Sequence, residues 1–574
     1  MRHAMRYVAL GTAAALVLGA CSSIPTDGPV QEGDADVDPV EPFEPIVQGP
    51  GATDGPAAIV TGFLTAAAGG VASDFTVARE FLTPEAAATW DPSARTLVYD
   101  SGAVAPEWDE NAGTVTYEVP LAASVDDSGR LTDAADETVE RVEFEMEQDD
   151  DGQWRIASLA DGVVVSEANF TGFFRAVQLV FATPDLTTAA PELRWLPRVN
   201  AATAAARELI EGPSPWLADA VVTGFPATAA LAVESVLVEG GVATVDLTAQ
   251  SAGTPQERAL AEEQLTMTLG SLPDVTDVDV RIGGLPIAAD DEVELEQPPV
   301  PEATAAVLVN DRLGLWDGDD LVVPDGTGAV AADAYGLALS YDGTEAAFVT
   351  DGVGVQTTTV LSVGFDAMVP VEQAGDLTAP VDAATVIEGS NLLPPSYDRY
   401  GDLWTVERAG GPLLVDMGQG EPLSLGDTWL TGRSVLSLAA SRDGSRIAVL
   451  SKAGGQASLE VAAIVRDAEG VPTGIGEPLG VGAGIGSGVD IAWTDALTVA
   501  VLGEPVDGTA SPLWLASVGG FTTALVTLRN ANTVTARSGE SSLVVVGEDG
   551  TVEERAGTSW ATVLEGVEDV AYAG

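Results

Sequence analysis

Histidine and cysteine are almost absent from this chain. Among 574 residues there is one histidine, His3, and one cysteine, Cys21. A chain that loses its first 20 residues therefore has no histidine to serve as a general base, as part of a Ser-His-Asp triad or as a metal ligand. A single cysteine cannot form a disulfide within the chain. We expect no catalytic residue, no cofactor and no bound metal ion.

Basic residues are also scarce. The chain has 24 Lys and Arg against 88 Asp and Glu, a formal net charge of −64, and Lys452 is its one lysine. Binding to nucleic acid depends on neutralising phosphates with Lys and Arg, so this composition argues against nucleic acid as a partner. It argues equally against broad electrostatic adhesion to anionic lipid. The acidic residues are spread along the chain, which indicates solubility and self-repulsion rather than a specific site.

The apolar run near the start is short. Arg2 and Arg6 precede an uncharged apolar segment from Tyr7 to Gly19, which is shorter than the about 20 residues that a membrane-spanning helix needs. A basic start, a short apolar middle and small residues before a cut are the layout of a secretory signal peptide. We therefore predict that residues 1–20 are a signal peptide.

A lipidation motif ends this signal peptide. Leu18, Gly19 and Ala20 precede Cys21, and a bacterial lipobox has an apolar residue, two small residues and then cysteine. The motif predicts that Cys21 carries an S-linked diacylglycerol and an N-linked acyl chain, since two or three chains anchor a protein stably. The mature chain would begin at Cys21 on the outer face of a cell membrane. The alternatives are a chance cysteine in a plain secretion signal and a transmembrane anchor.

Four further segments precede the C-terminal half. Residues 21–55 are rich in Pro, Asp, Glu and Gly and cannot bury a core, so we expect a disordered tether. Residues 56–168 change from helical to alternating apolar periodicity, which predicts an α+β domain of the nuclear-transport-factor-2-like (NTF2-like) kind. Residues 169–285 interleave strands with two helices in a second α+β domain, and residues 286–303 are an acidic, Pro-rich linker.

Within these domains the pattern predicts particular elements. Helices are expected over residues 57–68, 75–82, 203–211 and 255–269, with a further turn leading to Trp90; strands are expected over residues 115–119, 142–146, 154–156, 177–181, 193–196, 233–238, 242–247 and 275–282. Gly240-Gly241 separates two of these strands and predicts a hairpin. The run Asp149 to Asp151 could hold a cation, but an acidic hairpin turn is the simpler interpretation.

Residues 304–574 carry a weak repeat. Ser340, Ser396, Ser441, Thr494 and Ser538 each follow an apolar strand and precede another, at intervals of 44 to 56 residues. A strand, a Ser-x-Asp-Gly turn and a second strand at this spacing are typical of β-propeller blades. The Ser hydroxyl and Asp carboxylate would bond to backbone groups in the turn, and Gly would supply a positive φ. We expect five or six blades, with the segment 567–572 pairing with the segment 306–323 to close the ring; an irregular β-sandwich is the alternative.

Several motifs together resemble one family over nearly the whole chain, the LpqB lipoproteins of actinobacteria. They are Cys21-Ser-Ser-Ile-Pro25 with the following residues up to Gln31, Ile59-Val-Thr-Gly62-Phe63-Leu64, Ala78-Arg79-Glu80-Phe81-Leu82-Thr83 with Trp90, and, for a GerMN (sporulation and germination) domain, Leu196-Pro197-Arg198, Ala205 to Pro213, Ala243 to Leu247 and Gln264 to Leu269. The resemblance implies an extracytoplasmic accessory protein that contacts the outer region of the histidine kinase MtrB in cell-envelope and division signalling. It implies no catalytic residue, and Asp246 and Arg207 would serve the fold.

The sequence favours a lipid-anchored, non-enzymatic binding protein. Two other functions stay open. An envelope-glycan hydrolase needs only two suitably spaced carboxylates, although no spacing here singles out a pair. A small ligand could instead be held in the pocket of the N-terminal domain or in the channel of the propeller. Trp404, Trp493 and Trp560 are expected in the cores of the blades.

Overall fold

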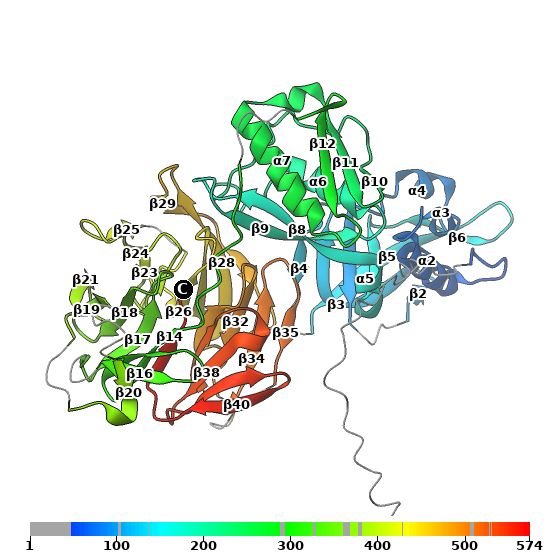
Figure 1. The fold of residues 1–574 in the computed structure, drawn as a ribbon. Coiled ribbons are helices and arrows are strands. Elements are labelled where there is room, and N and C mark those ends of the chain that lie inside the picture. Colours follow the sequence, from blue (N-terminus) through cyan, green and yellow to red (C-terminus); the bar gives the residue numbers. More distant parts are fainter. Residues whose placement is uncertain are drawn as a thin grey trace, which may run out of the picture. The chain divides into compact units, whose positions relative to one another are not determined.

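The computed structural model describes residues 48–100, 105–135, 137–287, 293–324, 329–359, 368–376, 381–426, 429–505, 510–526, 528–529 and 531–574. The signal peptide, Cys21 and most of the tether lie outside these residues. Two α+β domains are followed by an all-β propeller, which confirms the predicted fold class (Figure 1). In the described part of the chain, no helix has the length and apolar character needed to cross a bilayer.

The N-terminal domain wraps a sheet around its first helix. Its elements are α2 (Pro56–Gly70), α3 (Thr76–Arg79), α4 (Pro84–Thr89), β1 (Arg95–Tyr99), β2 (Glu107–Asp109), β3 (Thr114–Asp126), β4 (Leu131–Asp133), β5 (Val139–Gln148), β6 (Trp154–Ser158) and β7 (Val163–Ser166). The main path of the sheet is β6-β5-β3-β1-β7, with β1 and β7 parallel. Pro56 occupies the first turn of α2, as expected for a residue without an N–H.

The predicted helix over residues 75–82 was wrong in extent. Only Thr76–Arg79 is helical. Phe75, with φ of 59°, precedes the helix as its N-cap, and its ring lies edge-on to Trp90 with ring centroids 5.8 Å apart. The helix ends before Leu82 because this segment pairs with β6: the Ile156 N–H donates to the Phe81 carbonyl oxygen and the Thr83 N–H donates to the Ile156 carbonyl oxygen.

The middle domain packs two helices on one face of a four-stranded sheet. Its elements are α5 (Glu167–Phe173), β8 (Phe174–Ala182), β9 (Ala189–Pro197), α6 (Ala201–Glu211), β10 (Leu237–Glu239), β11 (Val242–Leu247), η1 (Ala249–Ala252), α7 (Pro255–Gly270), β12 (Asp277–Ile282) and β13 (Leu285–Pro286). The sheet order is β10-β11-β12-β13, and β8 and β9 form a separate hairpin. The Gly240-Gly241 hairpin is present between β10 and β11. Residues 233–236, predicted as strand, lie outside β10.

Helix α7 begins with a capping box. The Thr254 hydroxyl accepts a hydrogen bond from the Glu257 N–H, and the Glu257 carboxylate accepts one from the Thr254 N–H. The segment after β13 is not free of the domain, since Leu295 is buried and the Ala189 N–H donates to the Glu296 carbonyl oxygen at 2.8 Å. The segment expected as a linker therefore packs against the β8–β9 hairpin in part.

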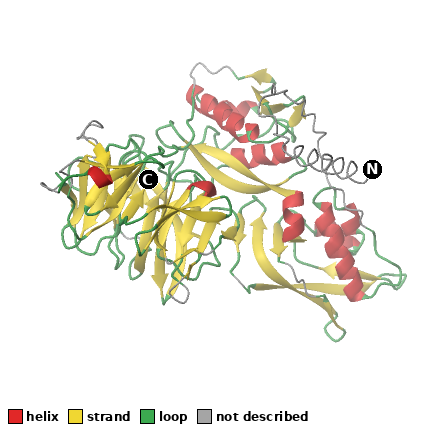
Figure 2. Ribbon diagram, turned by 60° about the horizontal axis from the view of Figure 1, so that its bottom comes forward, coloured by secondary structure: helices red, strands yellow, loops and turns green. Residues whose placement is uncertain are grey.

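The propeller contains six blade sheets among the described residues (Figure 2). From the inner strand outward they are β41 (Asp569–Ala571), β14 (Ala305–Val309), β15 (Arg312–Trp316), β16 (Leu321–Pro324) and β20 (Met368–Pro370); β17 (Ala334–Leu339), β18 (Glu345–Thr350), β19 (Gly354–Thr359) and β21 (Ala384–Glu388); β22 (Ser396–Tyr397), β23 (Leu403–Thr405), β24 (Leu413–Asp416) and β25 (Leu423–Leu425); β26 (Ser434–Ala440), β27 (Arg446–Ala453), β28 (Gln456–Arg466) and β29 (Pro472–Ile475), with β30 (Leu479–Val481) also on β28; β31 (Asp490–Trp493), β32 (Thr498–Leu502), β34 (Leu513–Ser517) and β35 (Thr522–Ala524); and β37 (Ala531–Ala536), β38 (Leu543–Gly547), β39 (Val552–Ala556) and β40 (Ser559–Leu564).

The last strand of the chain closes the ring. β41 pairs antiparallel with β14, with Val570 opposite Val307, so the first sheet of the propeller contains strands from both ends of the domain. This pairing confirms the closure predicted from the sequence. A further pair of short strands, β33 (Ala510–Ser511) and β36 (Leu528–Arg529), lies beside the fifth sheet in sequence, and η3 (Val371–Gln373) and η4 (Glu540–Ser542) are single 3-10 turns.

The repeated Ser-x-Asp-Gly turns adopt the predicted geometry. The Ser340 hydroxyl donates to Asp342 Oδ1 at 2.6 Å and accepts from the Glu345 N–H, while Gly343 has a φ of 68°. Ser441, Asp443 and Gly444 repeat this arrangement in the fourth sheet. The positive φ explains why glycine ends the motif.

Candidate binding site in the propeller channel

The pocket expected in the N-terminal domain is filled by side chains. The Phe63 ring lies edge-on to Trp90 at 5.2 Å and to Phe144 at 6.0 Å between ring centroids. The cavity that remains beside Phe63 and Phe144 measures about 20 Å³, roughly the space that one water molecule needs. This domain therefore offers little room for a ligand in its present conformation.

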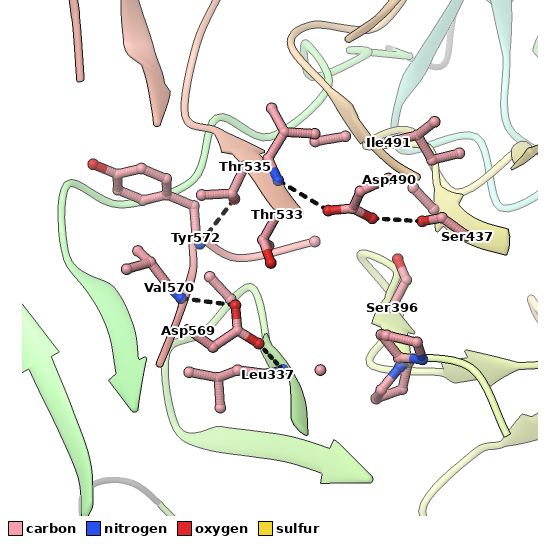
Figure 3. Close-up of a pocket in the computed structure, with 18 of the residues that line it drawn as sticks. Leu337, Ser396, Ser437, Asp490, Ile491, Thr533, Thr535, Asp569, Val570 and Tyr572 are labelled. Carbon is pink, nitrogen blue, oxygen red and sulfur yellow. Dashed lines mark hydrogen bonds between the residues drawn. The ribbon is translucent and has the colours of Figure 1, made fainter. Parts of the chain in front are cut away.

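The channel of the propeller is much larger. The inner strands β17, β22, β26, β31, β37 and β41 contact one another in a ring, and residues from all six line a cavity of about 440 Å³ (Figure 3). Small-molecule sites in proteins commonly measure about 300–1,000 Å³. The size and the enclosure by six strands make this channel the strongest candidate for a binding site in the described structure.

Asp490 links three blades at the wall of the channel. It is the first residue of β31, and its Oδ1 accepts a hydrogen bond from the Ser437 hydroxyl of β26 at 2.7 Å. Its Oδ2 accepts from the Val534 N–H of β37 at 2.9 Å (Figure 3). Burial raises the pKa of Asp490 to about 6, although the hydrogen bonds from Val534 and Ser437 oppose this effect. One carboxylate thus holds two neighbouring inner strands in register.

Asp569 has the same role where the ring closes. Its Oδ2 accepts a hydrogen bond from the Leu337 N–H of β17 at 2.8 Å, and its Oδ1 accepts from the Val570 N–H at 2.9 Å. Burial raises the pKa of Asp569 to about 7, and the nearby charge of Asp490 adds to this increase. Each carboxylate oxygen can accept two hydrogen bonds, so both aspartates keep acceptor capacity toward the channel.

A buried arginine lines the same cavity. Arg442, in the turn after β26, is 4% exposed. Its Nη2 donates to the Trp493 carbonyl oxygen at 2.9 Å and to the Ala536 carbonyl oxygen at 3.2 Å. Within the described residues, no carboxylate lies within 4.0 Å of this guanidinium, and the same holds for buried Arg312, whereas the buried arginines Arg194, Arg446, Arg466 and Arg555 each have such a partner.

Ionic contacts join the propeller to the middle domain. Arg399 Nη2 lies 2.7 Å from Asp185 Oδ2 and 2.9 Å from Asp185 Oδ1, and its guanidinium stacks on the Tyr400 ring at 4.0 Å. Arg446 is fully buried; it donates to Asp443 Oδ2 at 2.9 Å and to the Pro191 carbonyl oxygen of β9. These contacts fix the β8–β9 hairpin to the turns of the third and fourth blade sheets.

The turn between β34 and β35 contacts both the middle domain and the N-terminal domain. Phe521, which precedes β35, lies 5.6 Å from the Trp195 ring and 5.7 Å from the Phe170 ring, edge-on to both. Trp195 Nε1 donates to the Gly519 carbonyl oxygen at 3.1 Å, and the Thr522 hydroxyl donates to Asp133 Oδ2 at 2.6 Å. All three domains therefore meet at the β34–β35 turn.

Most residues singled out by the sequence have structural roles. Asp246 Oδ1 accepts from the Gly284 N–H, and Arg207 donates to the Glu234 carbonyl oxygen. Asp149 Oδ1 accepts the N–H groups of Asp151 and Gln153, which is the bonding of a hairpin turn. Trp404 and Trp493 are buried in blades, as expected, and Trp560 is partly buried. The lipobox residues Leu18, Gly19, Ala20 and Cys21 lie outside the described residues.

Sequence reasoning did not identify Asp490, Asp569 or Arg442. Asp490 and Asp569 belong to no motif, Arg442 occupies the variable position of the Ser441-x-Asp443-Gly444 turn, and the partners of all three on other blades lie between 44 and 232 residues away along the chain. One signal was available: Asp490 and Asp569 each open a short apolar strand that follows a glycine-containing segment. Placing the two residues on one channel, however, requires knowing which strand of each blade is innermost.

Comparison with known proteins gives a coherent assignment. Residues 49–171 match the family model "Lipoprotein LpqB, N-terminal domain", residues 178–288 match "Sporulation and spore germination", and residues 311–572 match "Lipoprotein LpqB beta-propeller domain". Lipoprotein LpqB of Thermobifida fusca is 27% identical and covers 97% of this chain and of its own length. Lipoprotein LpqB of Cutibacterium acnes is 26% identical over 98% of both chains, and that of Streptomyces coelicolor is 28% identical over 99% of this chain and 98% of its own. With these three domains in the same order, the chain belongs to the LpqB lipoprotein family.

Proposed function

We propose that this protein is a lipid-anchored, extracytoplasmic accessory protein that modulates a two-component sensor kinase of the MtrB type without itself catalysing a reaction. Cys21 carries the lipid, and the acidic, Pro-rich tether of residues 21–55 holds the three domains off the membrane. The lipobox sequence and the lipoprotein names of the relatives support the anchor. The kinase as partner rests on the family resemblance.

The observation that carries the binding role is the junction of the three domains. The Arg399–Asp185 ion pair, the buried Arg446 and the contacts of Phe521 hold the domains to one another. A rigid, multi-domain surface suits protein recognition, since the protein itself then loses less conformational freedom on binding. The absence of histidine beyond His3 and of cysteine beyond Cys21 in the sequence supports a non-enzymatic role.

Crosslinking in native membranes tests this proposal. The lipidated protein is captured after crosslinking, and its partners are identified by mass spectrometry. A sensor kinase recovered with wild type, and lost when residues 169–285 or 304–574 are deleted, would support the proposal and locate the contact. The control variant is Arg141→Ala, which changes an exposed surface residue of β5. The proposal would be contradicted if neither the full protein nor this control captured the kinase.

A second function has one specific observation in its favour. The propeller channel of about 440 Å³ is large enough for a small ligand, whereas the cavity in the N-terminal domain is not. Ligand capture would therefore use the propeller.

An envelope glycan is the other candidate, as a substrate rather than a captured ligand. Incubation of the protein with cell-wall glycan would reveal turnover if Asp490 and Asp569 acted on it as paired carboxylates.

A further inference from the structure

The channel holds buried groups of opposite charge at two different depths. Asp490 and Asp569 stand at the start of their inner strands, on one side of the cavity. The Arg442 guanidinium lies at the other end of these strands, because it bonds to the carbonyl oxygens of Trp493 and Ala536, the last residues of β31 and β37. Along β31, Trp493 is three residues beyond Asp490, and along β37, Ala536 is two residues beyond Val534, which donates to Asp490; at a strand rise of about 3.3 Å per residue, the two levels lie about 7–10 Å apart.

Among the described residues no carboxylate forms an ion pair with Arg442, and burial lowers the pKa of this guanidinium, an effect that the charge of Asp495 opposes only in part. A buried guanidinium costs free energy unless it is paired and hydrogen-bonded, yet the described residues offer it two carbonyl oxygens through Nη2 and no bond to Nε or Nη1. The other charged residues that line the cavity are Arg408 and Glu568. Arg408 is itself a cation, and Glu568 is exposed and forms no ion pair with Arg442 within the described structure.

The two aspartates present the complementary chemistry. Each of their four carboxylate oxygens accepts a hydrogen bond from the propeller, and the backbone of Ile491 and of Gly336 supplies one further bond to Asp490 and to Asp569. Each carboxylate therefore retains about one acceptor site, and an ammonium group has three N–H donors for such acceptors. Figure 3 shows these carboxylates and their partners on the wall of one cavity.

From this arrangement we infer that the propeller channel binds a short peptide with free termini, its ammonium group at Asp490 and Asp569 and its carboxylate at Arg442. An extended chain advances by about 3.3–3.6 Å per residue, so a separation of about 7–10 Å fits a peptide of two or three residues. The carboxylate would accept charge-assisted hydrogen bonds from the free nitrogens of Arg442. The inference concerns a ligand of the protein and is independent of its proposed kinase partner.

Isothermal titration of the detergent-extracted, full-length protein tests the inference. The probes are trialanine, N-acetyl-trialanine, trialanine amide and glycine. We expect saturable binding of trialanine, with affinity reduced by about tenfold to hundredfold when either terminus is blocked, since each block removes one charged hydrogen-bonded contact. Glycine is zwitterionic but too short to contact the aspartates and Arg442 at the same time, so we expect its affinity to be reduced by a similar factor.

Variants separate recognition from stability. Arg442→Gln is expected to weaken binding of trialanine by about tenfold or more and to leave binding of trialanine amide unchanged. Arg537→Gln is the matched control, because Arg537 occupies the corresponding turn after β37 but donates to the Pro301 carbonyl oxygen and does not line the channel. If Arg442→Gln fails to fold, the comparison of free and blocked peptides on the wild-type protein tests the inference by itself. Absence of trialanine binding, or equal binding of the free and blocked peptides, would overturn the inference.

Discussion

The Arg399–Asp185 pair allows a quantitative test of how the propeller is held to the middle domain. Its side chains are 14% and 21% exposed, and Arg399 approaches both oxygens of Asp185. Exposed ion pairs contribute about 0–1 kcal/mol, and breaking a fully buried pair costs about 3–5 kcal/mol. For this partly buried pair we expect a coupling of about 1–2 kcal/mol in a double-mutant cycle of Asp185→Asn and Arg399→Met.

The pH dependence of the pair has a defined sign. Burial by itself would raise the pKa of Asp185, but hydrogen bonds from Thr183 and Arg399 and the charge of Arg399 outweigh it and lower the pKa to about 2. A carboxyl group whose pKa is lowered by folding stabilises the folded state above its ordinary pKa of 3.8. This contribution is lost as the pH falls from about 4 through about 2, and Asp185→Asn should remove it.

Hydrogen exchange is the suitable assay, because a multi-domain chain does not unfold in one two-state step. The Leu186 N–H bonds to the Thr183 carbonyl oxygen in the loop that contains Asp185, so its opening free energy reports on the contact. Asp279→Asn is the control, since the Asp279–Arg281 pair is 33% and 42% exposed and should contribute less than about 1 kcal/mol. A coupling near zero for Arg399 and Asp185, equal to that of the control, would refute the account of this junction.

Three further predictions address the channel, a blade contact and the anchor. Burial raises the pKa of Asp569 to about 7. The contribution of this group to the free energy of unfolding is therefore fully present below its ordinary pKa and is lost as the pH rises through about 7. Asp569→Asn should flatten the decline of the melting temperature between pH 5 and pH 8, and an unchanged slope would contradict this. Gly336→Ala should destabilise the propeller by about 2–4 kcal/mol, because φ is 68° and a Cβ would lie 2.6–2.8 Å from atoms of Pro394. Gly343 has the same φ but open space around a Cβ, so Gly343→Ala should cost about 1–2 kcal/mol. Equal melting temperatures of the two variants would show that the Pro394 contact does not matter. Cys21→Ser should release the protein from membranes into the soluble fraction while Ser23→Ala remains bound, and a membrane-bound Cys21→Ser protein would contradict the lipid anchor.

Local chemistry carried much of the fold prediction. The Ser340–Asp342–Gly343 turn was predictable because its bonds lie within six residues, and the apolar strands on either side give the blade repeat. The Thr254–Glu257 capping box likewise marks the start of α7 within four residues. Where a structure is determined by neighbours in sequence, the residues themselves predict it.

Long-range packing accounts for what the sequence did not reveal. β1 and β7 are parallel neighbours separated by more than 60 residues, and neither was predicted as a strand. The predicted helix over residues 75–82 ends at Arg79 because Leu82 pairs with Ile156 of β6, more than 70 residues away. No motif marks the channel roles of Asp490, Asp569 and Arg442, since their bonds to Val534, Leu337 and Ala536 form only when the blades assemble into a ring.

The most direct test of the proposed function measures the kinase itself. An MtrB-type sensor kinase is reconstituted in lipid vesicles, and its autophosphorylation rate is followed with the lipidated protein, with Cys21→Ser, and with the control Ser23→Ala. The account predicts that the lipidated protein and Ser23→Ala change the rate by the same factor, and that Cys21→Ser needs a much higher concentration for the same change because the anchor no longer supplies the effective concentration. An autophosphorylation rate that is identical with and without the protein, at saturating protein on the extracytoplasmic side, would contradict the account.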